Sequence, residues 1–339
     1  MRALNLGLAA TALLARSAAR IATCGLVGGT REIGPVVPAG RPQGQRWTVL
    51  ADDGVVLHAE VDGDPCAPLT VVLCHGYALT GESWCFQRAA LADWARVVVW
   101  DQRGHGWSER GPAAHATIDQ LGRDLLAVLE QTATTGPVVL VGHSMGGMAI
   151  MALAEQRPDL FGDRIAGVAL LGTSAGPVTV DFGLPSRAMD ALHHVAPWAM
   201  SALCRVPALA RFAPVRDLLR LLVGRHAFGS EVPPAVGDFL VGLIESVSLD
   251  VLADFFPQFR YHDKRAALSA LADVACLVMA GEHDLLTPCR DSETIVAAVP
   301  HAEYVVVPGA GHAFPLERPD LVNTQLSRFL DGFVQLRSA

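Results

Sequence analysis

Three short motifs of the sequence carry side chains that together could perform nucleophilic catalysis. Ser144 lies in GHSMGG, Asp284 in GEHDLLTP and His312 at the end of GAGH. A serine hydroxyl is a weak nucleophile unless a base takes its proton and a third group orients that base. The chain therefore holds, in the order Ser, Asp, His, the residue types that an activated serine requires.

The GHSMGG motif itself predicts a strand, a tight turn and a helix with a serine at the apex. An apolar run over 138–141 precedes the motif, and a helical pattern follows it from Met148. Gly142 and Gly146 flank the serine because a sharp strand-to-helix turn leaves no room for Cβ atoms. This geometry places the Ser144 hydroxyl at a helix N-terminus, where backbone N–H groups point at a developing anion.

A second loop can supply the donors that stabilise such an anion. HGY, residues 75–77, closes another predicted strand. The backbone N–H groups of Tyr77 and Met145 can form an oxyanion hole. We expect His75 either to shape this loop or to contact substrate.

The elements that must position these residues alternate regularly between strands and helices. Apolar runs typical of buried strands cover 69–74, 95–100, 138–141, 165–171, 274–279 and 303–307, and a hairpin is expected over 47–61. Helical patterns separate most of them, which predicts an α/β fold with a mostly parallel central β-sheet and helices on both faces. Because the carboxyl ends of parallel strands share one edge, Ser144, Asp284 and His312 should converge there.

Taken together, the motifs HGY, DQRGHGWS, GHSMGG, GEHDLLTP and GAGH resemble the α/β-hydrolase family, over roughly residues 45–336. The resemblance implies that Ser144 is the nucleophile, His312 the general base and Asp284 its orienting acid. The serine at the apex of the GHSMGG turn, which we call the elbow, distinguishes the chain from epoxide hydrolases and dehalogenases, which carry aspartate there. The DQRGHGWS loop is expected to brace the site.

The alternation of strands and helices is interrupted between about 173 and 262. This stretch holds seven of the twelve phenylalanines, and six prolines break its helical patterns, which favours an inserted α-helical lid. The hydrolase core then comprises 45–172 and 263–339. Within the lid, Trp198, Phe255 and Phe256 are expected either to contact an acyl chain or to form the internal core of the lid.

Residues 1–44 differ from the rest of the chain and form an expected N-terminal segment and linker. A short apolar run is followed by arginines, and Arg2, Asn5, Arg16 and Arg20 gather on one side of a helical wheel. The pattern favours an amphipathic helix that packs on the protein or contacts a membrane surface through residues 1–24. A cleaved signal peptide and a membrane span are the alternatives, and we expect a cytoplasmic protein rather than a secreted one.

Composition excludes other classes of protein. The net charge of −8 argues against nucleic acid as a partner. The seven cysteines show neither disulfide-framework nor metal-ligand spacing, so a reducing compartment, no structural metal and no cofactor are expected.

The sequence thus predicts a serine hydrolase for a small ester or lipid-like substrate with an apolar acyl group. Carbon–carbon bond hydrolysis and cofactor-free perhydrolysis (haloperoxidase chemistry) on the same triad are the alternatives, because they share these motifs. A non-catalytic ligand receptor is a further alternative, against which the complete triad argues.

Overall fold

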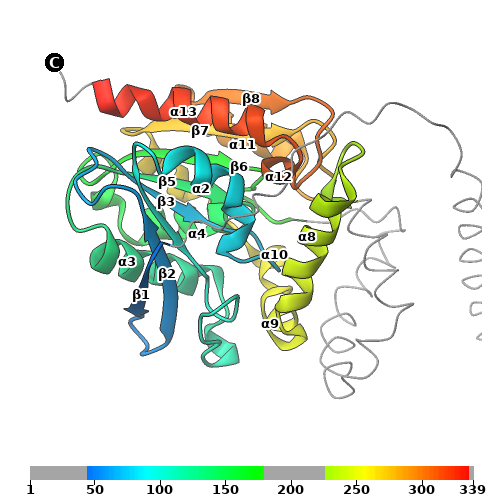
Figure 1. The fold of residues 1–339 in the computed structure, drawn as a ribbon, viewed down its shortest axis with the longest axis horizontal. Helices are drawn as coiled ribbons and strands as arrows, with labels where there is room; N and C mark the ends of the chain where they lie inside the picture. Colours follow the sequence, from blue (N-terminus) through cyan, green and yellow to red (C-terminus); the bar gives the residue numbers. More distant parts are fainter. Residues whose placement is uncertain (1–43, 179–225, 336–339) are drawn as a thin grey trace, which may run out of the picture. The chain divides into compact units, whose positions relative to one another are not determined.

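The computed structural model describes residues 44–178 and 226–335, drawn in colour in Figure 1. One eight-stranded sheet has the order β1-β2-β4-β3-β5-β6-β7-β8. The strands are β1 Gln45–Leu50, β2 Val56–Asp62, β3 Thr70–Cys74, β4 Arg96–Trp100, β5 Val138–His143, β6 Ile165–Leu171, β7 Ala275–Gly281 and β8 Glu303–Val307. β2 pairs antiparallel with both β1 and β4, and the remaining neighbours are parallel. The predicted mostly parallel sheet is confirmed.

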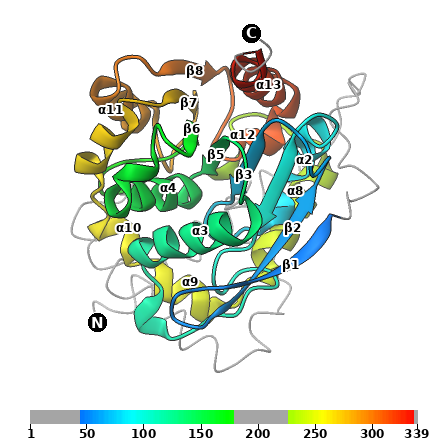
Figure 2. The same ribbon diagram turned by 90° about the vertical axis from the view of Figure 1, so that its left-hand side faces the viewer.

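Helices cover both faces of this sheet (Figure 2). The α-helices of the described chain are α2 Cys85–Leu91, α3 Ile118–Thr132, α4 Met145–Gln156, α8 Pro234–Ser246, α9 Leu249–Phe255, α10 Gln258–Tyr261, α11 Cys289–Ala298, α12 Phe314–Glu317 and α13 Pro319–Gln335. Short 3-10 helices are η1 Gly81–Trp84, η2 Ala113–His115, η3 Pro158–Leu160 and η4 Arg265–Leu271. Helices α3, α4 and α11 contribute to the core on one face, and α2 and α13 to the core on the other.

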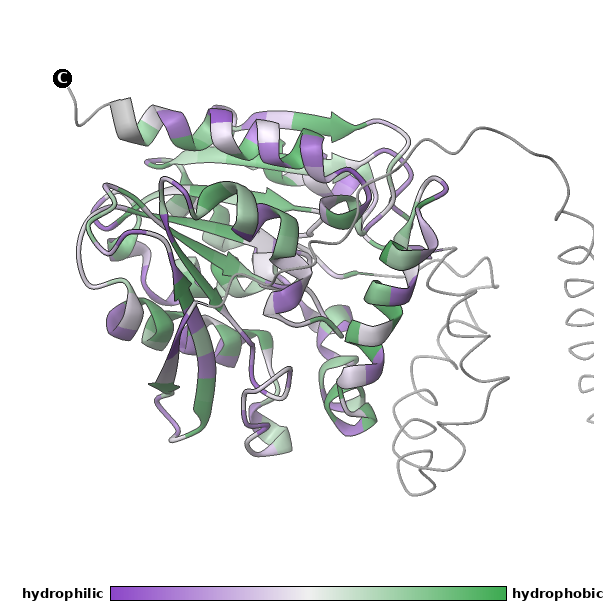
Figure 3. Cartoon of the chain, viewed as in Figure 1, coloured by the Kyte–Doolittle hydropathy of each residue, from purple (hydrophilic) through white to green (hydrophobic). Residues whose placement is uncertain are grey.

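The burial of the strands explains why they read as continuous apolar runs. Val71 packs into one core and its neighbour Val72 into the other, as the two-residue period of a strand requires. A sheet that is covered on both faces needs apolar side chains at every position. Figure 3 shows the central strands in green, whereas α13 carries purple and green stripes as an amphipathic surface helix does.

Helix α3 illustrates how local sequence sets an element boundary. The Thr117 side chain accepts a hydrogen bond from the Gln120 N–H at 3.1 Å, so Thr117 is the N-cap that the sequence TIDQ predicts. From there the helix buries Leu121, Leu125 and Val128 at the spacing of one helical face.

The described part of the inserted segment, which we define as residues 173–262, consists mainly of α8, α9 and α10. Helix α8 buries Val236, Leu240 and Leu243 in a small third core. The segment leaves and rejoins the hydrolase core at one place, where the Lys264 N–H donates to the Ala175 carbonyl at 2.7 Å. Trp198 and the N-terminal segment lie outside the described residues, so the predictions made for them stay predictions. In the part of the chain that is described, no helix has both the length and the apolar character needed to cross a membrane.

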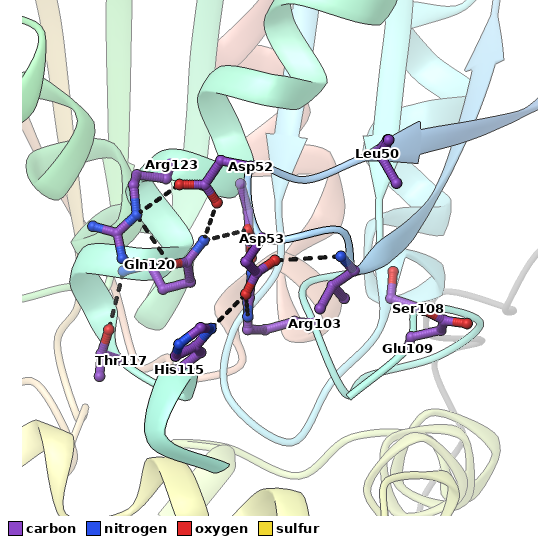
Figure 4. A network of polar contacts seen from close by, with 12 residues as sticks. Leu50, Asp52, Asp53, Arg103, Ser108, Glu109, His115, Thr117, Gln120 and Arg123 are labelled. Atoms are coloured by element: carbon purple, nitrogen blue, oxygen red, sulfur yellow. Dashed lines mark hydrogen bonds and ion pairs between the residues drawn. The ribbon is translucent and has the colours of Figure 1, made fainter. Parts of the chain in front are cut away.

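A polar network holds the loop that follows β4 (Figure 4). The Arg103 guanidinium is fully buried and donates to Asp124 at 2.6 Å and to Asp53 at 2.9 Å. Asp53 also accepts from His115 Nδ1 at 2.6 Å. The Arg103 hydrogen bond holds the pKa of Asp53 well below its usual range, against the effect of burial. The network thereby ties the DQRGHGWS loop to α3 and to the β1–β2 turn.

Removal of the Arg103 charge should destabilise the fold strongly. Arg103→Met leaves Asp124 buried without its cation, and breaking a buried pair in this way costs about 3–5 kcal/mol of unfolding free energy. Urea unfolding of the variant measures the loss. Arg123→Met is the matched control, because the Arg123–Asp52 pair is nearly half exposed to solvent and such a pair is worth about 1 kcal/mol or less. Equal losses in the two variants would contradict this assignment.

Candidate active site

Ser144 occupies a strained turn between β5 and α4. Its φ of 53° and ψ of −117° lie in a region that residues with a Cβ rarely adopt. A Cβ on Gly146 would lie 2.1 Å from the Cys74 carbonyl oxygen, and one on Gly142 would lie 2.6 Å from Gly147 N. Both glycines are therefore required by close backbone contacts, as the motif predicts.

The turn is held by hydrogen bonds to the Ser144 backbone and not by the Ser144 hydroxyl. Ser144 N–H donates to the Leu171 carbonyl at 2.9 Å, and the Thr173 hydroxyl donates to the Ser144 carbonyl at 2.8 Å. Although Ser144 is the N-cap residue of α4, its side chain makes no capping hydrogen bond within the described chain. The serine is therefore not at this position to cap the helix, and its hydroxyl is available for chemistry.

Asp284 lies three residues beyond the end of β7 and is almost fully buried. Its Oδ1 accepts from the N–H groups of Leu286 at 2.8 Å and Thr287 at 2.9 Å. Its Oδ2 accepts from the Thr287 hydroxyl at 2.9 Å and from His312 Nδ1 at 2.8 Å. Burial would raise the pKa of this carboxyl, but His312 and the Thr287 donors outweigh burial and lower the pKa below its ordinary value. The group is therefore held as a carboxylate.

His312 follows β8 and has one ring nitrogen committed to Asp284. With Nδ1–H donating to the carboxylate, Nε2 keeps its lone pair. The His312 carbonyl accepts from His143 Nε2 at 2.9 Å, and the two rings lie 4.8 Å apart between centroids. Since Ser144 follows His143 directly, the His312 loop and the elbow are in contact.

The HGY loop also contacts the elbow. A Cβ on Gly76 would lie 3.3 Å from the Ser144 Cβ, so the Tyr77 backbone begins beside the serine. Ala78 turns the loop at a φ of 61°. Neither Tyr77 N–H nor Met145 N–H donates to an acceptor among the described residues, which leaves two donors at this place.

His75 is not placed as a substrate contact. The ring is fully buried, its Nδ1–H donates to the Gly76 carbonyl at 2.8 Å, and its Nε2 accepts from Gln102 N–H at 2.9 Å. With both nitrogens engaged inside the protein, His75 shapes the loop, which is the other of the two roles expected for it. The prediction of substrate contact by His75 is corrected accordingly.

The two phenylalanines predicted near the substrate differ in their surroundings. Phe255 is 1% exposed and packs on His105 with ring centroids 5.8 Å apart, so it belongs to the main core rather than to a substrate surface. Phe256 is only partly buried and remains a candidate contact.

A small hollow lies between the HGY loop and the His312 loop. It is partly open to solvent and has room for about one water molecule. Its lining is mostly apolar and consists of Leu79, Ser83, Trp84, His143, Ala313, Pro315 and Leu316. Across the described ranges, no three His, Cys, Asp or Glu side chains gather as metal ligands would.

Thr287 belongs to the site although the sequence reasoning did not single it out. Its hydroxyl lies 2.9 Å from Asp284 Oδ2 and 3.2 Å from His312 Nδ1. The available signal was its spacing, because an Asp commonly accepts hydrogen bonds from backbone and side-chain donors two or three residues later.

With this geometry the chain can be compared with known proteins. The family profile described as alpha/beta hydrolase fold matches residues 70–319, which is more than half of the chain. The chain belongs to the α/β-hydrolase fold family, and it is a hydrolase of that family. The predicted resemblance is confirmed.

Relatives of similar identity have different activities. An epoxide hydrolase A from Mycobacterium tuberculosis is 29% identical over 83% of this chain and 95% of its own length. The dihydrolipoyllysine-residue acetyltransferase component of an acetoin cleaving system from Pseudomonas putida is 28% identical over 80% of this chain, and the chain spans only 65% of that relative. A solved esterase from Thermogutta terrifontis is 27% identical, covers 85% of this chain and 99% of its own, and superposes with a TM-score of 0.67.

Buried neutral histidines beside the site should make the fold sensitive to acid. Burial lowers the pKa of His75 to about 4 and those of His105 and His143 to about 3. In the unfolded chain these rings take up protons below about pH 6.5, so stability is present above that pH and falls as the pH drops toward about 4. The expected slope is about 1.4 kcal/mol per pH unit for each histidine.

Urea unfolding at pH 7, 6 and 5 measures this slope. His105→Gln should lower the slope by about 1.4 kcal/mol per pH unit, since one titrating ring is removed. A free energy of unfolding that stays constant from pH 7 to pH 5 would rule out the neutral buried rings.

Proposed function

We propose that the protein is a serine hydrolase that cleaves a carboxylic ester or a related acyl bond. The observation that carries the proposal is the 2.8 Å hydrogen bond between His312 Nδ1 and buried Asp284. It is accompanied by a serine in a strained turn whose hydroxyl makes no capping hydrogen bond. This arrangement leaves His312 Nε2 as a base on the loop that contacts the serine turn. Activated serines of this kind carry out acyl transfer.

The proposed reaction has two halves. Ser144 Oγ attacks the acyl carbon while its proton passes to His312 Nε2, and the Tyr77 and Met145 N–H groups stabilise the oxyanion. His312 then returns the proton to the leaving alcohol, and the acyl group stays on Ser144. A water that gives its proton to His312 attacks the acyl carbon. The bond from this carbon to Ser144 Oγ then breaks as His312 returns the proton to that oxygen, and the acid and free Ser144 are released. Asp284 stabilises the imidazolium in both halves.

The residue at the elbow favours this chemistry over that of the epoxide hydrolase relative. Position 144 is a serine, which forms an ester with an acyl substrate, whereas the family's epoxide hydrolases carry aspartate there. The apolar surroundings of the site support an apolar acyl group as the substrate class. These surroundings include Leu79, Ala313 and Leu316, which pack with α8. Contact of residues 1–24 with a membrane lies outside the described residues and stays a prediction.

A fluorophosphonate probe tests the activated serine directly. Wild-type protein should be labelled, and Ser144→Ala should not be labelled, because the probe reacts with an activated hydroxyl. His312→Ala should lower turnover by about a million-fold and Asp284→Asn by about 10,000-fold. Labelling of Ser144→Ala, or normal turnover in His312→Ala, would refute the assignment.

Esters of increasing chain length test the substrate class. With p-nitrophenyl esters from acetate to decanoate, kcat/KM should rise with chain length until the apolar surface is filled. Each buried methylene contributes about 0.8 kcal/mol, which is up to about fourfold per carbon. A rate that falls steadily from acetate onward would contradict an apolar acyl site. Labelling without any ester turnover would instead favour carbon–carbon bond hydrolysis or perhydrolysis on the same triad.

A further inference from the structure

A second buried carboxylate, outside the proposed triad, lies close to His312 in the chain. Glu317 ends α12 and is 4% exposed. Its Oε1 accepts from Ser230 N–H at 2.7 Å and from the Ser230 hydroxyl at 2.6 Å. Its Oε2 accepts from Gly311 N–H at 2.8 Å, and Gly229 N–H lies 3.1 and 3.2 Å from the two oxygens. Every partner is a donor, so the site suits a carboxylate and not an amide.

These partners belong to two different parts of the protein. Gly311 immediately precedes His312 in the chain. Gly229 and Ser230 lie just ahead of α8 in the inserted segment, and we call residues 227–230 the root of α8. The Glu317 carboxylate therefore joins the His312 loop to the root of α8.

A second connection lies on the other side of His312. Ala313 N–H donates to the Ala227 carbonyl at 2.7 Å. Both chain neighbours of His312 are thus held by the root of α8, one directly and one through Glu317. These two connections hold the backbone on both sides of His312, while the His312 ring is held separately by its hydrogen bond to Asp284.

The backbones at this junction are in direct contact. A Cβ on Gly311 would lie 2.5 Å from Gly229 N, and one on Gly281 would lie 2.3 Å from the Gly311 carbonyl oxygen. The His312 loop is packed between the end of β7 and the root of α8. A shift of the root would therefore be transmitted to Gly311 and His312.

We propose that Glu317 is a positioning residue that couples the docking of the inserted segment to the placement of His312. This inference rests on the proposed function, in which His312 is the base for Ser144. Glu317 touches no reacting atom. Its effect is that the distance from His312 Nε2 to the serine depends on how the root of α8 is seated.

The test compares two glutamates that bind the same loop. Glu317→Gln replaces an acceptor by an amide that opposes the N–H donors. Glu282→Gln is the matched control, because among the described residues the Glu282 side chain accepts only from Gly309 N–H, at 2.7 Å, on the exposed side of the loop. The measurements are the rate of fluorophosphonate labelling, the kcat and KM for a p-nitrophenyl ester, and the thermal unfolding midpoint, all taken below the unfolding transition.

The expected result separates positioning from general support. Glu317→Gln should lower the labelling rate and kcat by roughly 10- to 100-fold, with KM changed much less, because a misplacement of about 1 Å costs about 100-fold in rate. Glu282→Gln should stay within about twofold of wild type. Folded Glu317→Gln with wild-type labelling rate and kcat would overturn the inference, whereas unlabelled wild-type protein would overturn the proposed function.

Ser230→Ala supplies an independent variant that keeps Glu317 and its bond to Gly311. It removes the hydroxyl bond to Glu317 and the exposed one that the hydroxyl accepts from Arg318 at 3.1 Å, and it applies even if Glu317→Gln fails to fold. The coupling predicts a lower kcat at nearly constant KM, smaller in size than for Glu317→Gln. A wild-type kcat in Ser230→Ala would show that the root does not act on His312 and would overturn the proposal.

Discussion

The close contact of backbones around Ser144 is the constraint on which the rest of the site depends. β5 ends and α4 begins within one residue, and the turn is wedged against the end of β3, where only hydrogen fits on Gly146. The strained φ of Ser144 is stabilised by the end of the neighbouring strand β6, since Leu171 and Thr173 hold the Ser144 backbone. The position of the serine hydroxyl is thus set by the sheet rather than by local backbone preference, and the proposed base and acid need only reach the same edge.

Three further loops complete that edge, and each is held by contacts of its own. The HGY loop is fixed by buried His75, the Asp284 turn by its own backbone and by Thr287, and the His312 loop by Asp284 and His143. Burial keeps His75 and His143 neutral near pH 7, because their pKa values are lowered to about 4 and about 3. A neutral ring can accept one hydrogen bond and donate another, and His75 accepts from Gln102 N–H and donates to the Gly76 carbonyl.

The described part of the inserted segment belongs to this arrangement. α8 shares a small core with Leu79, which follows the HGY loop, and with Ala313 and Leu316 beyond His312. α9 is held by the Tyr77 hydroxyl, which donates to the Leu252 carbonyl at 2.6 Å. Through Glu317 and Ala227 the segment also holds the backbone of the proposed base. The described part of the segment and the backbone on either side of His312 are therefore physically linked.

The sequence by itself determined the strands, the helix cap at Thr117 and the glycines of the elbow, because each depends on local periodicity or on contacts between near neighbours. The order of the motifs at strand ends also determined that serine, aspartate and histidine would share one edge of the sheet. Only the tertiary structure decided that His75 and Phe255 are buried, and that Glu317 meets Ser230, 87 residues away in the chain. Those contacts depend on which distant segments pack together, and that is a property of the assembled core that no local pattern encodes.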